Sequence, residues 1–270
     1  AATFAGVKTL AARAGYRLAP GEMDAEGLTP EALDRAAAAG AKVAYLMPVQ
    51  NPTARVMSLE RRTAVVEVAR RRDLQIVEDD LYGAFAAPLG LPPLAALAPE
   101  RTTYVGGLSK ALAPGLRVGF LVPPAALAER MQEALRAIAF GAPTFGPAVA
   151  AAWIEDGTAF DILGEVLRET EARADIARSI LGRAAAPSPL AAQPHLWLPM
   201  SELEAERLYG RALRAGVRLT PPGAVAVDGA PVQGLRLCLG GPASRVTLER
   251  GLRCVAQALT ADPAEVGDVV

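Results

Sequence analysis

Apolar and polar positions in the first half of the chain follow two alternating periods. Residues 28–40 and 58–73 carry apolar side chains at helical spacing, and Thr29 and Ser58 are placed to cap these helices. Near-continuous apolar runs of strand length occupy residues 42–48, 74–80, 102–107 and 116–122. Such runs are typical of strands covered on both faces, so the pattern predicts a βαβ layout with helices packed on an α/β sheet.

The helix predicted over residues 58–73 has a clear inner face. Val65, Val68 and Ala69 are expected to point toward the sheet, and the arginines are expected to face solvent. The arginine run at 70–72 falls at the end of this helix, where cations suit the helix dipole.

The hydrophobic pattern changes after a long helical region at about residues 146–182 and a Pro/Ala-rich joint at 184–194. Strands are then predicted at 195–200, 216–221 and 235–240, and helices at 201–216 and 244–261. These shorter elements indicate a small α+β domain. We therefore expect a partial large cofactor-binding domain over residues 1–165, and an interdomain helix with the small carboxy-terminal domain over residues 166–270.

The chain opens with apolar residues at helical spacing, Phe4, Val7, Leu10 and Ala11, and Gly15 is placed to end that helix. Because the sequence begins inside a helix, we expect it to be part of a longer protein. No charged leader precedes an apolar core, and no apolar run reaches membrane-spanning length. We therefore expect no membrane partner and a cytoplasmic location.

Composition narrows the classes of function. The 270 residues are 51% hydrophobic, enough for a large core, and a net charge of −1 leaves no basic surplus for binding nucleic acid. Cys238 and Cys254 have neither metal-ligand spacing nor the density of a disulfide framework, which suits a reducing cytosol. The single histidine, His195, is interpreted as structural, and Trp153 and Trp197 as core residues.

Lysine is rare in this chain. Of the 28 basic residues only Lys8, Lys42 and Lys110 are lysines, so arginine serves almost wherever a cation is needed. A guanidinium stays protonated and cannot attack a carbonyl, whereas a desolvated amine can. Lys110 is therefore a candidate nucleophile, with chance placement of one lysine in a loop as the alternative.

Three polar residues follow the ends of predicted strands. Asn51, Asp79 and Lys110 each come at or just after an apolar run. In an open α/β sheet the carboxyl ends of the strands are where ligands bind, although solvated loop ends would look the same. An amine, a carboxylate and an amide are the set that pyridoxal phosphate needs as an electron sink, and Arg117 adds a cation suited to its phosphate.

Four motifs carry a family resemblance. The segments QNPT (50–53), EDDLYGAF (78–85), GGLSKALAPGLRVGF (106–120) and GLRLCLGG (234–241) occur in this order. With them the chain resembles fold-type I pyridoxal-phosphate aminotransferases of class I/II over essentially its whole length. It looks most similar to the aminotransferase-like domain of MocR-type regulators in the GntR group and to their enzyme relatives.

The resemblance implies two catalytic residues. Lys110 would bind pyridoxal 5'-phosphate as a Schiff base and move the substrate α-proton, and Asp79 would hold the pyridine nitrogen protonated. Asp80 is the main rival of Asp79. Strand alternation turns these neighbours to opposite faces, and the spacing to Tyr82 favours Asp79.

The resemblance also implies the other contacts. Asn51 and Tyr82 would bind the ring hydroxyl, Arg117 the phosphate, and Ser109 lies beside the lysine among the cofactor-binding residues. On a strand of the small domain, Arg236 is predicted to bind the substrate carboxylate, because a planar fork suits that group. An ordinary strand-end cation is the alternative for Arg236.

Two departures from the family pattern bear on cofactor binding. Gly107 stands where the family usually has a serine or threonine whose hydroxyl reaches the phosphate. The family's glycine-rich phosphate turn and the aromatic that stacks on the ring would both lie before Ala1. We expect the isolated chain to retain cofactor poorly.

Three functions fit these features. The first is an aminotransferase that exchanges an amino group between an amino acid and a 2-oxo acid, acting as a homodimer. The second is the effector-sensing domain of a MocR-type GntR transcriptional regulator. The third is a scaffold that has kept the fold without the cofactor.

Overall fold

The structure is a computed structural model that describes residues 2–227 and 230–260. The chain forms two compact units. The sheet unit comprises residues 21–51 and 55–168, and the terminal unit comprises residues 1–20, 52–54 and the chain from Glu169 onward. The α/β class predicted from the sequence is confirmed. The boundary predicted at residues 165/166, between the large cofactor-binding domain and the interdomain helix with the small domain, stays a prediction.

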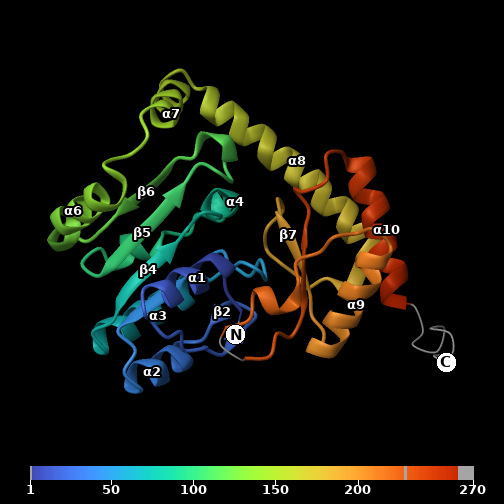
Figure 1. Ribbon diagram of the computed structural model, residues 1–270, viewed down its shortest axis with the longest axis horizontal. Coiled ribbons are helices and arrows are strands. Elements are labelled where there is room, and N and C mark those ends of the chain that lie inside the picture. Colours follow the sequence, from blue (N-terminus) through green and yellow to red (C-terminus); the bar gives the residue numbers. More distant parts are fainter. Residues whose placement is uncertain (1, 228–229, 261–270) are drawn as a thin grey trace. The chain divides into compact units, whose positions relative to one another are not determined.

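The sheet unit is built on four strands (Figure 1). They are β3 (Val43–Leu46), β4 (Gln75–Asp79), β5 (Thr102–Gly107) and β6 (Gly119–Val122). In the order β3-β4-β5-β6 the first three strands run parallel, and β6 pairs antiparallel with β5. Because parallel strands end at the same edge, the segments that follow β3, β4 and β5 come together there.

Helices α2 (Pro30–Ala38), α3 (Leu59–Arg71) and α5 (Leu94–Leu97) share a core with one face of this sheet. Both predicted caps are present: the Thr29 and Ser58 hydroxyls accept from backbone N–H groups three residues later, at 3.3 and 3.1 Å. The buried core consists of Leu33, Ala44, Leu46, Val65, Val66, Val68, Ala69, Leu74, Ile76, Leu94 and Ala98.

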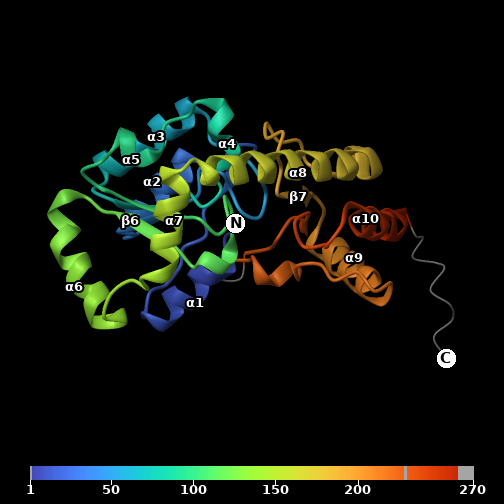
Figure 2. The same ribbon diagram turned by 90° about the horizontal axis from the view of Figure 1, so that it is seen from above.

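Shorter elements complete the sheet unit. They are β1 (Met23–Asp24), β2 (Gly27–Leu28), α4 (Gly83–Ala86), α6 (Ala128–Ala139), α7 (Phe145–Glu155) and the 3-10 turns Ala87–Leu89, Pro114–Leu116 and Ala125–Leu127. The first part of α8 (Thr158–Leu181) also belongs here, and Figure 2 shows α8 as one unbroken helix.

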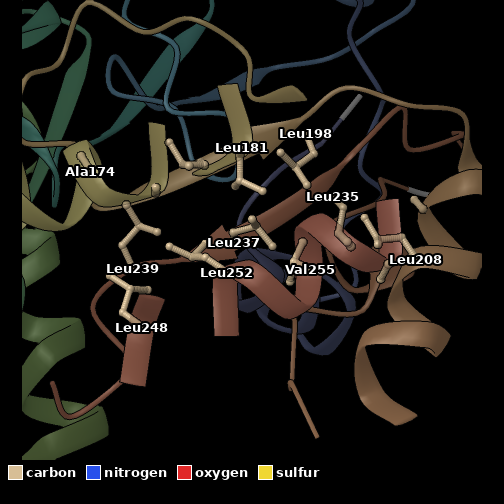
Figure 3. Close-up of a cluster of buried hydrophobic side chains, with 14 residues drawn as sticks. Ala174, Leu181, Leu198, Leu208, Leu235, Leu237, Leu239, Leu248, Leu252 and Val255 are labelled. Atoms are coloured by element: carbon tan, nitrogen blue, oxygen red, sulfur yellow. The ribbon is translucent and has the colours of Figure 1, made fainter. Parts of the chain in front are cut away.

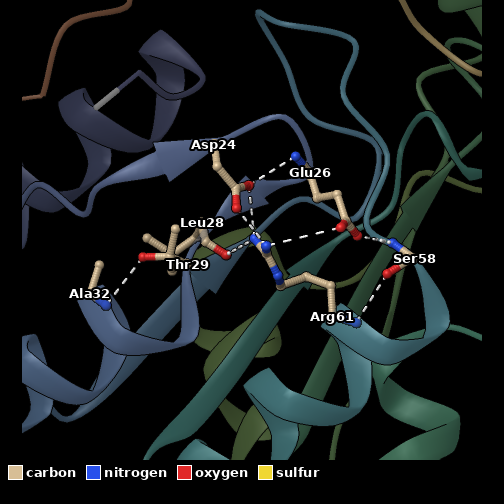
Figure 4. Close-up of polar contacts among 7 residues, drawn as sticks. All are labelled: Asp24, Glu26, Leu28, Thr29, Ala32, Ser58 and Arg61. Atoms are coloured by element: carbon tan, nitrogen blue, oxygen red, sulfur yellow. Dashed lines mark hydrogen bonds and ion pairs between the residues drawn. The ribbon is translucent and has the colours of Figure 1, made fainter.

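A group of polar side chains, the hairpin clamp (Asp24, Glu26, Ser58 and Arg61), ties the β1–β2 hairpin to the start of α3 (Figure 4). Arg61 pairs with Asp24 at 2.6 Å and donates to the Leu28 carbonyl at 3.1 Å. Glu26 accepts from the Ser58 N–H at 3.0 Å. The clamp therefore fixes where α3 begins, directly after the loop that follows β3.

The terminal unit contains the antiparallel pair β7 (His195–Leu198) and β8 (Leu235–Cys238). Its helices are α1 (Ala5–Arg13), the rest of α8, α9 (Glu202–Arg214) and α10 (Arg245–Thr260), with 3-10 turns at Gly182–Ala184 and Pro222–Ala224. Leucines from both strands and from α8, α9 and α10 form its core (Figure 3). His195 is 1% exposed and Trp197 is 4% exposed, in line with the structural roles predicted for them.

Several local expectations are wrong. The strand predicted at 216–221 does not form; the chain leaves α9 through a bond from the Val217 N–H to the Ala212 carbonyl at 2.8 Å, and the residues after it pair with no strand that the structure describes. β6 is exposed along its length rather than covered on both faces. Arg62, expected in solvent, is 4% exposed, because its guanidinium donates to the Met57 and Pro92 carbonyls at 3.1 and 2.7 Å.

Candidate active site

The end of β4 presents two neighbouring carboxylates to opposite faces of the sheet. In the parallel register Tyr45 lies opposite Val77, and Glu78 lies opposite Tyr104. Asp79 follows Val77 by two residues and therefore shares its face, whereas Asp80 shares the face of Glu78. The alternation predicted for these aspartates is thus present in the backbone register.

Asp79 is held at both carboxylate oxygens. The Tyr45 hydroxyl of β3 donates to Oδ2, and the Leu81 N–H donates to Oδ1 at 3.3 Å. Burial, followed by the Asp79 charge, raises the pKa of Tyr45 well above its usual value, so the phenol stays a donor. A carboxylate offers about four acceptor positions. Asp79 can therefore accept further hydrogen bonds, as the proposed contact with a protonated pyridine nitrogen requires.

Asp80 has a different environment. Its Oδ2 accepts from the Tyr104 hydroxyl of β5 at 3.0 Å, and burial raises its pKa. It lines a cavity of about 50 Å³ together with Arg62, and a Cβ on Gly83 would come within 2.2 Å of its carboxylate. Such a small, crowded space suits a structural carboxylate, and it leaves no room for a cofactor ring.

Glu78, the residue before Asp79 on β4, is also structural. It is 0% exposed, and its two oxygens accept from the Leu94 and Ala95 N–H groups, both at 2.8 Å. Burial raises its pKa, and the bonds from these two amides oppose that effect. Glu78 thus satisfies the first turn of α5 from the middle of the sheet.

Lys110 lies just beyond β5 and is exposed. Its Nζ is 5.9 Å from the centroid of the Tyr82 ring, and Tyr82 in turn contacts Phe85 with ring centroids 6.0 Å apart. Lys110 forms no ion pair with any residue that the structure describes. The amine, the phenol and Asp79 thus come from segments at the carboxyl ends of two adjacent parallel strands.

Arg117 lies at the end of the same loop that contains Lys110. The Leu108 N–H donates to the Val118 carbonyl at 3.1 Å, so residues 109–117 form the turn between β5 and β6. Ser109 and Arg117 stand at the two ends of that turn. Arg117 is exposed and has a left-handed backbone with φ of 53°, a conformation that non-glycine residues rarely adopt. Strain of this kind occurs preferentially at functional sites.

Gly107 has little room for a side chain. A Cβ there would lie 2.8 Å from the Leu81 side chain and 3.2 Å from the Val118 carbonyl oxygen. The second contact is with backbone, which cannot move aside cheaply. A serine at this position would therefore need the turn between β5 and β6 to shift.

Asn51 is 5% exposed and lies in a loop after β3 that is closed by the bridge between Val49 and Val56. The Gln50 side chain donates to its backbone carbonyl at 3.0 Å. Arg236 lies in the terminal unit, on β8, where it is half-buried between Leu235 and Leu237 and opposite Trp197. The structure therefore groups Lys110, Tyr82 and Asp79 on one sheet edge and describes Arg236 in a separate unit.

Residues 2–251 match the family description Aminotransferase class I and II. The chain belongs to this family. Its fold is that of the fold-type I pyridoxal-phosphate aminotransferases, as the motifs predicted.

Relatives of this class I and II aminotransferase chain include regulators and enzymes. YisV of Bacillus subtilis, an HTH-type transcriptional regulator by name, is 30% identical over 90% of the chain and 52% of YisV. The 2-aminoadipate transaminase of Thermus thermophilus is 29% identical over 80% of the chain and 56% of the enzyme. The chain spans about half the length of these two relatives.

Solved structures agree on the aminotransferase fold. The structure of LysN, an α-aminoadipate aminotransferase of Thermus thermophilus complexed with N-(5'-phosphopyridoxyl)-L-leucine, superposes with a TM-score of 0.84 at 26% identity. The match covers 96% of this chain and 69% of LysN. Among the described residues of our chain, no helix is both long enough and apolar enough to cross a bilayer.

Sequence reasoning missed two features of this candidate site. The bond from Tyr45 to Asp79 joins adjacent strands, and its only signal was a tyrosine inside the apolar run at 42–48. The burial of Arg62 beside Glu78 and Asp80 could not be predicted from the sequence. Its guanidinium donates mainly to backbone carbonyls, which every residue has, so no side-chain pattern marks it.

Proposed function

We propose that the full-length protein is a pyridoxal-phosphate-dependent aminotransferase that exchanges an amino group between an amino acid and a 2-oxo acid. The observation that carries this proposal is the grouping of Lys110, Tyr82 and Asp79 at one edge of the parallel sheet. When bound, the cofactor supplies an electron sink for cleavage of the bond to the substrate α-hydrogen.

Each residue has a defined task in this proposal. Lys110 would hold the cofactor aldehyde through its amine, and its Nζ would accept or return the substrate α-proton. Asp79 accepts a hydrogen bond from the protonated pyridine nitrogen. Its two existing donors stabilise the charged carboxylate and leave acceptor positions open, which supports that role.

The remaining residues orient the cofactor and the substrate. Asn51 and Tyr82 would bind the ring hydroxyl, and Ser109 and Arg117 would act at the phosphate. Arg236 would bind the substrate carboxylate through its planar fork. Arg236→Lys should therefore weaken amino-acid binding far more than cofactor binding, as separate titrations of the two ligands would measure.

Borohydride reduction tests the assignment directly. Full-length protein loaded with pyridoxal phosphate should lose its visible cofactor band on reduction, and peptide mapping should find the adduct on Lys110. An adduct on Lys8 or Lys42 would contradict the assignment. A transamination assay with a panel of amino acids and 2-oxo acids then identifies the substrate.

A second function has its own support. YisV, a regulator by name, is similar to this chain over 90% of the chain's length. In a MocR-type GntR regulator the same fold would sense an effector and would not turn it over. Repeated turnover of amino acid supports the enzyme, whereas cofactor binding without turnover, together with DNA binding by the full-length protein, supports the regulator. Homodimer formation and a cytoplasmic location belong to this proposal under either function.

A further inference from the structure

We propose that Tyr45 is a positioning residue for the cofactor. By donating to Asp79, it keeps that carboxylate ionised and oriented, so that Asp79 can hold a pyridine nitrogen protonated. This inference rests on the proposed function. It assigns a role to a residue of β3 that touches neither the substrate nor the reacting atoms.

The strand register dictates the contact. Tyr45 lies opposite Val77 in the parallel pair β3–β4, and Asp79 follows on the same face of the sheet two residues later. A tyrosine side chain is long enough to reach this diagonal neighbour, and its hydroxyl donates to Asp79 Oδ2. The backbone thus places the donor without help from a loop.

The contact leaves Asp79 ready for a third partner. The Leu81 N–H binds Oδ1 and the Tyr45 hydroxyl binds Oδ2, so both oxygens are fixed while acceptor positions remain on each. Donors aimed at a carboxylate stabilise its charged form. The two donors therefore favour the arrangement in which the proton lies on the pyridine nitrogen and Asp79 carries the negative charge. They disfavour the arrangement in which the proton lies on Asp79 and both groups are neutral.

The opposite face supplies a matched control. Tyr104 on β5 lies opposite Glu78, and it donates to Asp80, two residues later, at 3.0 Å. Tyr45→Phe and Tyr104→Phe thus delete the same hydroxyl from the same kind of diagonal bond to adjacent aspartates. Only the first bond involves the carboxylate proposed to meet the cofactor.

The test measures the cofactor nitrogen itself. Full-length wild-type protein and both variants are loaded with pyridoxal phosphate labelled with ¹⁵N in the ring, and the ¹⁵N chemical shift reports protonation. We expect Tyr45→Phe to move the shift toward the unprotonated value and to weaken cofactor binding by at most about tenfold, because the bond to Asp79 exists with and without cofactor and only its strengthening on binding is lost. The turnover number should fall, with little change in KM for the amino acid.

Tyr104→Phe should leave the ¹⁵N shift and the cofactor affinity at their wild-type values, even if it lowers thermal stability. In an Asp79→Ala background, Tyr45→Phe should have no further effect on cofactor affinity, because its partner is gone. Equal effects of the two Phe variants on the ¹⁵N shift, or additive losses in the Asp79→Ala background, would overturn the proposal.

Two outcomes separate this inference from the proposed function. If wild-type protein takes up no cofactor on Lys110, the proposed function fails. If it does so and Tyr45→Phe behaves as wild type, only the role of Tyr45 fails. If Tyr45→Phe does not fold, 3-fluorotyrosine is incorporated at position 45 in its place. Its phenol is more acidic and therefore a stronger donor, so the ¹⁵N shift should move toward the protonated value. An unchanged shift would reject the proposal.

Discussion

Asp79 and Asp80 are adjacent in sequence but differ in what surrounds them. Asp79 has two donors and open acceptor positions, whereas Asp80 accepts from Tyr104 and lines a small cavity with Arg62. The effect of substitution on activity should therefore separate these two neighbouring residues.

Alanine substitutions should show this separation. Asp79→Ala should abolish transamination, because an unprotonated pyridine is a poor electron sink, and should lower the free energy of unfolding by about 1 kcal/mol, since it leaves the Tyr45 hydroxyl without its acceptor. Asp80→Ala should keep most of the activity and lower the free energy of unfolding by a similar amount, about 1 kcal/mol, since it leaves the half-buried Tyr104 hydroxyl without its acceptor. Activity assays and denaturant titrations on both variants check this, and reversed effects would mean that the two roles are exchanged.

Arg117 should show a conflict between backbone and side chain. Its left-handed backbone favours glycine, while its guanidinium is proposed to bind the cofactor phosphate. Arg117→Gly should change the free energy of unfolding by less than about 1 kcal/mol. Glycine removes the backbone strain of the folded state, and this gain offsets the greater conformational entropy that glycine gives the unfolded chain. Cofactor affinity, followed by absorbance, should fall about tenfold or more.

Arg117→Lys is the matched control, because it keeps a positive charge and the strained backbone. It should retain part of the cofactor affinity that Arg117→Gly loses. If Arg117→Gly bound cofactor as tightly as wild type, the phosphate would have to be held by other groups.

Sequence reasoning at the residue scale succeeded where a motif or a strand end marked the position. Asn51, Asp79 and Lys110 were placed on one sheet edge because each comes at or after the end of a strand, and in the structure they come at or after the ends of the parallel strands β3, β4 and β5. Tyr45 was missed because its role depends on which strand lies beside β4 and in what register. The roles of all these residues at a cofactor stay predictions.

At the scale of elements, the hairpin clamp makes stability depend on pH. Hydrogen bonds from Ser58 lower the pKa of Glu26, and the bond from Arg61 lowers the pKa of Asp24. Carboxylates with lowered folded-state pKa values stabilise the fold above their unfolded values near pH 4. That contribution is lost as pH falls through the folded values.

Glu26→Gln should expose this contribution. At pH 7 the variant should unfold with a free energy about 0.5–1 kcal/mol below wild type, since Glu26 is partly exposed and solvent screens its charge. The difference should shrink as pH falls below 4, because wild-type Glu26 is then protonated too. Glu206→Gln, at an exposed position of α9, is the control and should match wild type at every pH.

The sequence predicted most helices and strands, but it did not predict which of them have a neighbour to pair with or pack against. Caps at Thr29 and Ser58 marked helix starts correctly, because a cap is a local signal. The strand predicted at 216–221 failed, since β-type composition forms a strand only where a neighbouring strand can pair with it. β6 formed, yet it is exposed on both faces within the part of the chain that the structure describes.

At the scale of the whole molecule, exposed apolar side chains gather on three consecutive elements of the sheet unit. Leu121 and Val122 on β6 are 57% and 56% exposed, Ile138 on α6 is 84% exposed, and Phe140 and Phe145 beyond it are 99% and 80% exposed. α6 buries none of its residues. Monomeric proteins rarely leave so much apolar surface in water.

We expect the isolated 270-residue chain to self-associate through these elements and to retain cofactor poorly. Because burial of apolar surface drives such association, Ile138→Lys combined with Phe140→Asn should shift the chain toward monomer in size-exclusion chromatography with light scattering. Phe140 has a left-handed backbone with φ of 55°, which asparagine tolerates better, so the second change should not harm the fold. Val246→Lys, at a residue of α10 that is 78% exposed, is the matched control and should leave the association unchanged. A wild-type chain that is monomeric and holds one equivalent of pyridoxal phosphate would contradict both expectations.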